Sequence, residues 1–140
     1  MKTPTQVMTQ IRNVILNIIS GRYEHNQSAW HCGTAACIAG WCQLEDISKE
    51  RSLSFYDIQL ALVESDYPEV PEGYEDAETH VLKHVQSNYL RTDIEELIFK
   101  DYLTLDEIID GFNKTIVRNK VNVSPIIRPY INTLKTKVKV

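Results

Sequence analysis

Apolar residues recur at helical spacing through most of this chain, and no other feature restricts its fold as strongly. The clearest run starts at Thr3, which can cap a helix, and Pro4, which fits the first helical position. Gly21 can end this helix in the left-handed conformation. The apolar positions between them share one helix face: Val7, Met8, Ile11, Val14, Ile15, Ile18 and Ile19. We therefore predict an amphipathic first helix.

The same spacing predicts several more helices. One runs from Thr34 to about Leu44, and another is capped by Ser54 and covers residues 55–62. Asp76 opens a helix that continues to Tyr89. Capping-box patterns starting at Thr92 and Thr104 each predict one more. The fold class that follows is all-α or mainly α, a single helical domain over residues 1–140 with about six helices.

The composition is that of an ordinary globular chain, which needs no cross-links to fold. The 140 residues are 43% hydrophobic and 24% charged, which is the usual range for a folded domain. The longest apolar stretch, residues 14–19, is too short to span a bilayer, and no signal-peptide pattern follows it. Three cysteines cannot all pair within one chain, so we expect free thiols in a reducing compartment. We therefore predict a cytoplasmic protein with no membrane partner.

Charge is unevenly distributed along the chain. Residues 45–78 carry eleven acidic residues against Lys49 and Arg51, whereas residues 111–140 carry seven basic residues and no acidic one. The basic residues are Lys114, Arg118, Lys120, Arg128, Lys135, Lys137 and Lys139. They could bind nucleic acid, with Phe112 or Tyr130 stacking on bases. The plainer interpretation is that they are solvated or lie near the acidic residues, with 121–140 a basic extension that can fray.

Residues 30–42 concentrate the reactive side chains, because they hold all three cysteines and both tryptophans. One hypothesis makes Cys32 a nucleophile beside His31. A cysteine just before a helix has its thiol pKa lowered by the helix dipole. The order Cys32-Gly33, with Gln27 upstream, resembles papain-like and bacteriocin-processing cysteine peptidases. Those families place the partner histidine later on a strand, whereas the later histidines here lie in a helical pattern.

Metal binding and redox sensing are two further alternatives for this segment. His31 and Cys32 have ligand atoms suited to zinc, and His80 and His84 are spaced to share a helix face. The paired Cys-x-x-Cys spacing of structural zinc sites is absent. A redox pair would join Cys32 to Cys37 and would need an exposed thiol of low pKa. We therefore expect no cofactor, with zinc as the alternative, and we expect the two later histidines to lie on an exposed or half-buried helix face.

The last interpretation of residues 30–42 is structural. Free cysteines behave as small hydrophobes, so Cys37 and Cys42 could pack with Ala36, Ala39 and Gly40 against the first helix. The segment resembles a motif of small uncharacterised bacterial and phage proteins. That resemblance rests on Trp30, His31, Cys32, Gly33, Thr34, Cys37, Ala39, Gly40 and Trp41. It implies that these residues form one unit, and it implies no activity.

No complete catalytic constellation accompanies these folding signals, and the chain lacks phosphate-loop, nucleophile-elbow and zinc-protease motifs. The leading hypothesis is therefore a non-enzymatic helical accessory or interaction protein with a protein partner. A cysteine- or metal-dependent enzyme centred on Cys32 is the first alternative. Nucleic-acid binding through the basic C-terminal region is the second.

Overall fold

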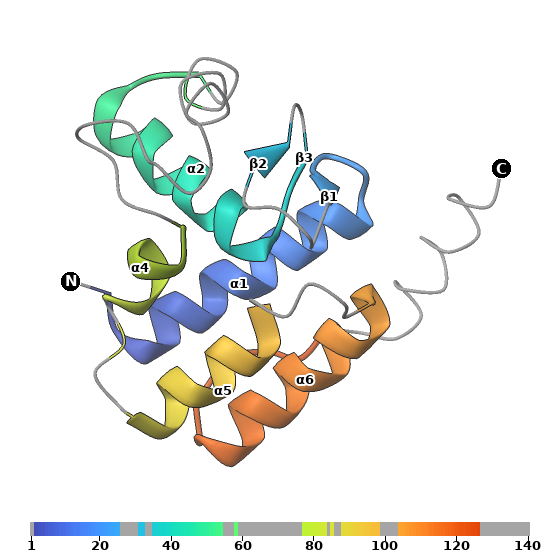
Figure 1. Cartoon of the computed structure of the whole chain (residues 1–140). Helices are drawn as coiled ribbons and strands as arrows, with labels where there is room; N and C mark the ends of the chain where they lie inside the picture. The colour runs from blue at the N-terminus through green and yellow to red at the C-terminus, as the bar shows by residue number, and fades with distance from the viewer. Residues whose placement is uncertain are drawn as a thin grey trace, which may run out of the picture.

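The computed structural model describes residues 2–25, 31–32, 35–54, 58, 77–83, 85, 88–98 and 104–126. This part of the chain is mainly α, as predicted (Figure 1). It contains five helices rather than about six: α1 (Pro4–Ile19), α2 (Ile38–Arg51), α4 (Ala77–Leu82), α5 (Asn88–Ile98) and α6 (Leu105–Arg118). The helix predicted over 55–62 lies outside the described residues except at Ile58, whose N–H donates to the Ser54 carbonyl at 3.2 Å.

Helices α1 and α6 begin at the caps that the sequence predicts. The Thr3 hydroxyl accepts from the Gln6 N–H while the Gln6 side chain accepts from the Thr3 N–H, which completes a capping box. Thr104 and Glu107 form the same reciprocal pair ahead of α6. Gly21 follows α1 with φ +83°, the left-handed conformation expected for it. Local side-chain chemistry therefore fixes both helix starts.

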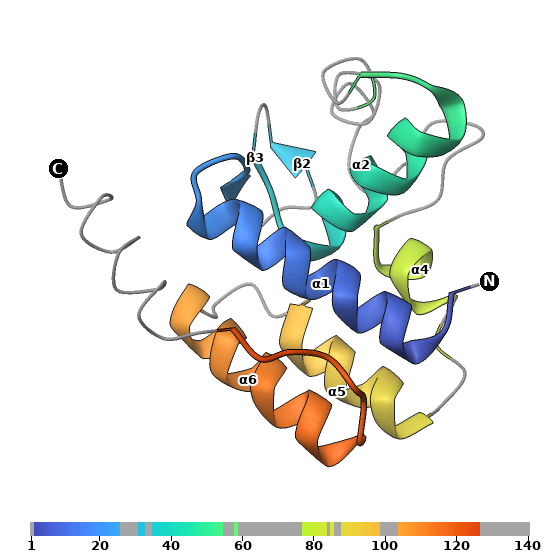
Figure 2. The same cartoon turned by 180° about the vertical axis from the view of Figure 1, so that it is seen from behind.

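Helix α1 lies in the middle of the molecule (Figures 1 and 2). Helix α2 packs on one side of it and in turn contacts α4, whereas the antiparallel hairpin of α5 and α6 covers the other side. The predicted apolar face of α1 is buried along its whole length, from Val7 to Ile19. Among the described residues, no helix is both long enough and apolar enough to cross a membrane.

Three two-residue strands form a small sheet next to the start of α2. They are β1 (Glu24–His25), β2 (His31–Cys32) and β3 (Ala35–Ala36), in the spatial order β1-β3-β2. Strand β3 pairs parallel to β1 and antiparallel to β2. The sequence pattern predicts no strand here, because pairing with β1 depends on contacts that a local pattern does not contain.

The predicted start and end of α2 are wrong, and the sheet explains the start. Ala35 and Ala36 use their backbone in strand pairing, so a helix cannot begin at Thr34. Cys37 is extended (φ −74°, ψ 176°) and serves as the N-cap of α2. The helix then continues past Leu44 to Arg51 and ends at Ser52 in the left-handed conformation. Ala36, which was expected in the same helix as Ala39 and Gly40, therefore lies in strand β3 ahead of α2.

The single helix predicted from Asp76 to Tyr89 is also wrong, because the chain turns inside it. Helix α4 ends at Leu82, and the Val85 N–H donates to the Leu82 carbonyl at 3.0 Å. Helix α5 starts at Asn88, so the box predicted at Thr92 lies within it. Val81 and Leu90 are buried on either side of the turn. Apolar spacing continues across the break, which is why the pattern did not reveal it.

The described part of the predicted C-terminal extension belongs to the fold. After α6, residues 121–126 run back along the α5–α6 hairpin (Figure 2). Val121 and Val123 pack against the core, and Ile126 is buried. Residues 127–140 lie outside the described residues, and with them Arg128, Lys135, Lys137, Lys139 and Tyr130.

Candidate functional site

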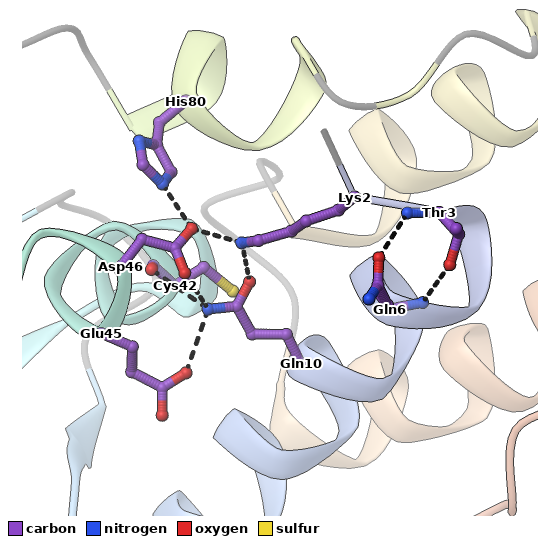
Figure 3. Close-up of polar contacts among 8 residues, drawn as sticks. All are labelled: Lys2, Thr3, Gln6, Gln10, Cys42, Glu45, Asp46 and His80. Atoms are coloured by element: carbon purple, nitrogen blue, oxygen red, sulfur yellow. Dashed lines mark hydrogen bonds and ion pairs between the residues drawn. The ribbon is translucent and has the colours of Figure 1, made fainter. Parts of the chain in front are cut away.

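A half-buried group of polar side chains joins three helices and the N-terminal segment (Figure 3). We call it the Asp46 cluster, and it consists of Lys2, Gln10, Glu45, Asp46 and His80. Lys2 precedes α1, Gln10 lies on α1, and His80 comes from α4. Glu45 and Asp46 project from α2.

Asp46 is the hub of this cluster. Its Oδ2 lies 2.7 Å from His80 Nε2 and also pairs with Lys2 Nζ, while its Oδ1 accepts from Gln10 Nε2 at 3.0 Å. Burial raises the pKa of Asp46, but the hydrogen bonds from His80, Lys2 and Gln10 and the charge of Lys2 outweigh it. The net pKa lies well below the ordinary value, so Asp46 is ionised. An ionised carboxylate can only accept, so His80 Nε2 carries the hydrogen.

Gln10 extends the cluster toward Glu45 and the α2 backbone. Its Oε1 accepts from Lys2 Nζ at 2.6 Å, and its Nε2 lies 3.2 Å from Glu45 Oε1 and 3.3 Å from the Cys42 carbonyl. These polar atoms therefore satisfy one another. An arrangement of this kind holds α1, α2 and α4 in a fixed relation.

An aromatic pair connects the cluster to the small sheet. The rings of Tyr23 and Trp41 are stacked, with centroids 4.1 Å apart and planes 8° from parallel. The Tyr23 hydroxyl donates to Glu45 Oε2 at 2.7 Å, and Trp41 Nε1 donates to the Glu24 carbonyl at 2.8 Å. Burial and the hydrogen bond to Glu45 raise the pKa of Tyr23. Trp41 thereby ties strand β1 to α2.

The cysteine at the start of α2 is Cys37, not Cys32. Cys32 and His31 lie in strand β2, so the expected helix dipole behind the Cys32 thiol is absent. Cys37 Sγ accepts from the Gly40 N–H at 3.4 Å. Burial raises the Cys37 pKa to about 11 and raises that of Cys42 well above its ordinary value. Neither buried thiol has the character of a nucleophile.

Part of the predicted structural unit is buried at the start of α2. Cys37, Ala39, Gly40 and Trp41 are all buried there, whereas Trp30, Gly33 and Thr34 lie outside the described residues. Cys42 is buried as well. Cys37 and Cys42 are therefore part of the hydrophobic core.

The predicted metal set is not assembled in the described residues. No three histidine, cysteine or acidic side chains in that part of the chain are grouped to hold a metal ion. His80 is buried against Asp46, which corrects the expectation of an exposed or half-buried position. His84 lies outside the described residues. Sequence reasoning missed the Asp46–His80 pair, because 34 residues separate its members and no local pattern connects them.

The predicted nucleic-acid surface is only partly described. Lys114, Arg118 and Lys120 are exposed, but Arg118 Nη1 lies 3.0 Å from Asp93 Oδ1. Asn119 also donates to Asp93, at 2.8 Å. Phe112 is buried in the core, so its predicted role in base stacking is wrong. The exposed aromatic residue at this end of the molecule is Tyr89.

Comparison with known proteins adds no assignment, because no family model, curated protein or solved structure matches the chain.

We expect Cys37 and Cys42 to resist iodoacetamide in the native protein. A pKa of about 11 at Cys37 lowers its thiolate fraction near neutral pH, by about a hundredfold relative to an ordinary thiol. Burial restricts access further. Peptide mapping by mass spectrometry would compare labelling with and without urea, with Cys32 measured in the same digest. Native labelling of Cys37 as fast as in urea would contradict the buried position.

Proposed function

We propose that this chain is a non-enzymatic binding module that docks an acidic protein segment at the open end of the α5–α6 hairpin. The docking surface consists of Tyr89, Lys114, Val117 and Lys120. The observation that carries the proposal is the exposure of two apolar side chains there, since Tyr89 is 84% and Val117 77% exposed. Aromatic residues are enriched in protein interfaces relative to the rest of the protein surface.

These residues lie at one end of the hairpin. The contacts of Asp93 with Arg118 and Asn119 fix the end of α6 beside the first turns of α5. Tyr89 is one helical turn before Asp93, and Val117 directly precedes Arg118. Lys114 is three residues before Val117 on α6 and therefore its neighbour on the helix surface.

The charge at this end favours an acidic partner. Lys114 and Lys120 are exposed, and residues 111–140 contain no acidic residue. A positive surface attracts an acidic segment and raises its association rate. A protein fits better than nucleic acid because Tyr89 and Val117 offer apolar contact area, whereas Arg118 is already paired with Asp93 and adds little net positive charge.

A binding role also agrees with the internal polar groups. The Asp46 cluster satisfies its own hydrogen bonds, and the buried thiols of Cys37 and Cys42 have raised pKa values. The free, buried cysteines suit the reducing cytoplasm, which we propose as the compartment.

The test uses a benzophenone amino acid at position 117, with position 13 on the exposed side of α1 as the control. We expect position 117 alone to cross-link a partner in cells that make the chain. With that partner purified, Tyr89→Ala should weaken binding about tenfold or more, the effect of losing a central aromatic contact. Leu53→Ala, which removes another exposed apolar side chain, should leave the affinity unchanged.

Two results would contradict the proposal. One is equal cross-linking of the same partner from positions 13 and 117. The other is binding of single- or double-stranded DNA or RNA that outcompetes the partner and weakens steeply as salt rises, which would assign the surface to nucleic acid.

A further inference from the structure

The chain leaves helix α6 through a turn that fixes where the next segment starts. The Val121 N–H donates to the Ile116 carbonyl at 3.0 Å. The Lys120 N–H donates to the Val117 carbonyl at 3.3 Å, and Lys120 has the left-handed conformation (φ 54°). Together these features form a Schellman motif, a common end of an α-helix. Val121 is therefore anchored to α6, and residues 122–126, which we call the strap, extend from that anchor.

The strap is attached to the helices mainly by apolar contacts. Among the described residues, its backbone hydrogen bond joins the Val123 N–H to the Val121 carbonyl at 3.0 Å, so it connects the segment to itself and not to a helix. Val123 is partly buried and packs against the core, and Ile126 is 5% exposed. The other strap residues are exposed: Asn122, Ser124 and Pro125. Two apolar side chains therefore hold the strap against the fold.

Asn113 on α6 contributes a buried polar atom without a partner. Its side-chain Oδ1 is buried, and no described residue donates a hydrogen bond to it. Asn113 is three residues before Ile116 and is therefore its neighbour on the helix surface. The strap runs back along the hairpin from its anchor at Ile116 (Figure 2), so it passes Asn113.

Arg12 on α1 contributes a second such atom. Its Nε is buried, and no described residue accepts a hydrogen bond from it. Gln10 contacts the α2 backbone, and residues two apart on a helix differ by about 200° in direction. Arg12 therefore lies on the side of α1 away from α2, the side that the α5–α6 hairpin covers. Figure 2 shows the strap running beside α1 on this side.

We propose that the strap is a detachable cover, which opens locally while the helices stay folded and exposes the apolar seam between α1 and α6. Closing the strap buries Val123 and Ile126, but it also keeps Arg12 Nε and Asn113 Oδ1 from water without giving them partners. Burial of an unpartnered polar atom is unfavourable, so opening relieves this cost. Local openings of this kind need less free energy than global unfolding. The strap contains no residue of the α5–α6 docking surface, so either proposal can fail without the other.

The experiment places a thiol at the buried end of the strap, as Ile126→Cys in the full chain. Iodoacetamide labelling at position 126 is measured by peptide mapping and compared with Cys42, which is buried on α2 of the same molecule. We expect position 126 to label about tenfold or more faster than Cys42, at a rate that urea below the unfolding transition hardly changes. Labelling of Cys42 should rise steeply with urea, because it requires global unfolding. Ser124→Cys, at an exposed position, gives the rate of an uncovered thiol.

Two results of this comparison would overturn the proposal. Equal rates and equal urea dependence at position 126 and Cys42 would mean that the strap opens only when the whole protein unfolds. A rate at position 126 equal to the rate in Ser124→Cys would mean that the strap is not held closed.

Further variants of the Ile126→Cys chain test the two unpartnered atoms, after circular dichroism has shown that each keeps the native helix content. Arg12→Met and Asn113→Leu retain apolar bulk and remove the polar atom. Each should slow labelling at position 126 by about fivefold or more, which corresponds to the low end of the cost of one buried unsatisfied group. Lys49→Met, which removes an exposed charge on α2, should leave the rate within about twofold. Unchanged rates in both Arg12→Met and Asn113→Leu would show that closing the strap does not bury these atoms, and would also overturn the proposal.

Discussion

Replacing Asp46 with Ala should lower the free energy of unfolding by about 2 to 3 kcal/mol, the range for charge-assisted hydrogen bonds whose partners are left unsatisfied. Asp46 is 21% exposed and accepts from His80, Lys2 and Gln10. Without it, the buried His80 imidazole and the Lys2 ammonium lose their shared partner. Urea unfolding followed by circular dichroism measures the difference. Glu50→Ala, on the exposed side of the same helix, should change the free energy of unfolding by less than about 0.5 kcal/mol.

The contribution of Asp46 should disappear in acid. Its pKa in the folded protein lies below the unfolded value of about 3.9, so folding favours the ionised form. The stabilisation is therefore complete above about pH 5 and is lost as the pH falls through about 4 toward the folded-state pKa. Asp46→Asn lacks this titration. The difference in free energy of unfolding between the unmodified chain and Asp46→Asn should become smaller below pH 4. A difference that stays constant from pH 6 to pH 3 would contradict the ionised state of Asp46 in the folded protein.

The helices predicted best are those with their signals in adjacent residues. Thr3 with Gln6 and Thr104 with Glu107 set their helix starts through hydrogen bonds three residues apart, so the sequence pattern contains the whole interaction. The predicted start of α2 is wrong because Thr34 is a preferred cap residue, whereas the helix is in fact capped by Cys37. Pairing of Ala35 and Ala36 with β1 decides between them, and that contact is not local.

The functional residues were harder to predict for the same reason. The cysteine-centred hypotheses place Cys32 directly before a helix. The helix starts later in the chain, at Ile38, and Cys32 lies in strand β2. Asp46 contacts His80 only because α2 packs against α4 in the folded chain.

Replacing Phe112 with Ala should cost about 3 to 5 kcal/mol, the range for truncating a fully buried aromatic residue. Phe112 is 0% exposed and lies on the inner face of α6 with Ile108, Ile109 and Ile116. Val117→Ala on the outer face of the same helix should cost less than about 0.5 kcal/mol. Both values come from urea unfolding at one pH.

The pair of variants also separates folding from binding on α6. Val117 is 77% exposed, so its loss should weaken partner binding while the fold persists. Phe112→Ala should instead reduce binding only to the extent that it unfolds the protein. A stabilising osmolyte, which favours the folded state, should then partly restore binding. A cost below about 1 kcal/mol for Phe112→Ala would mean that this ring is not held in the core. Base stacking by Phe112 would then become tenable again.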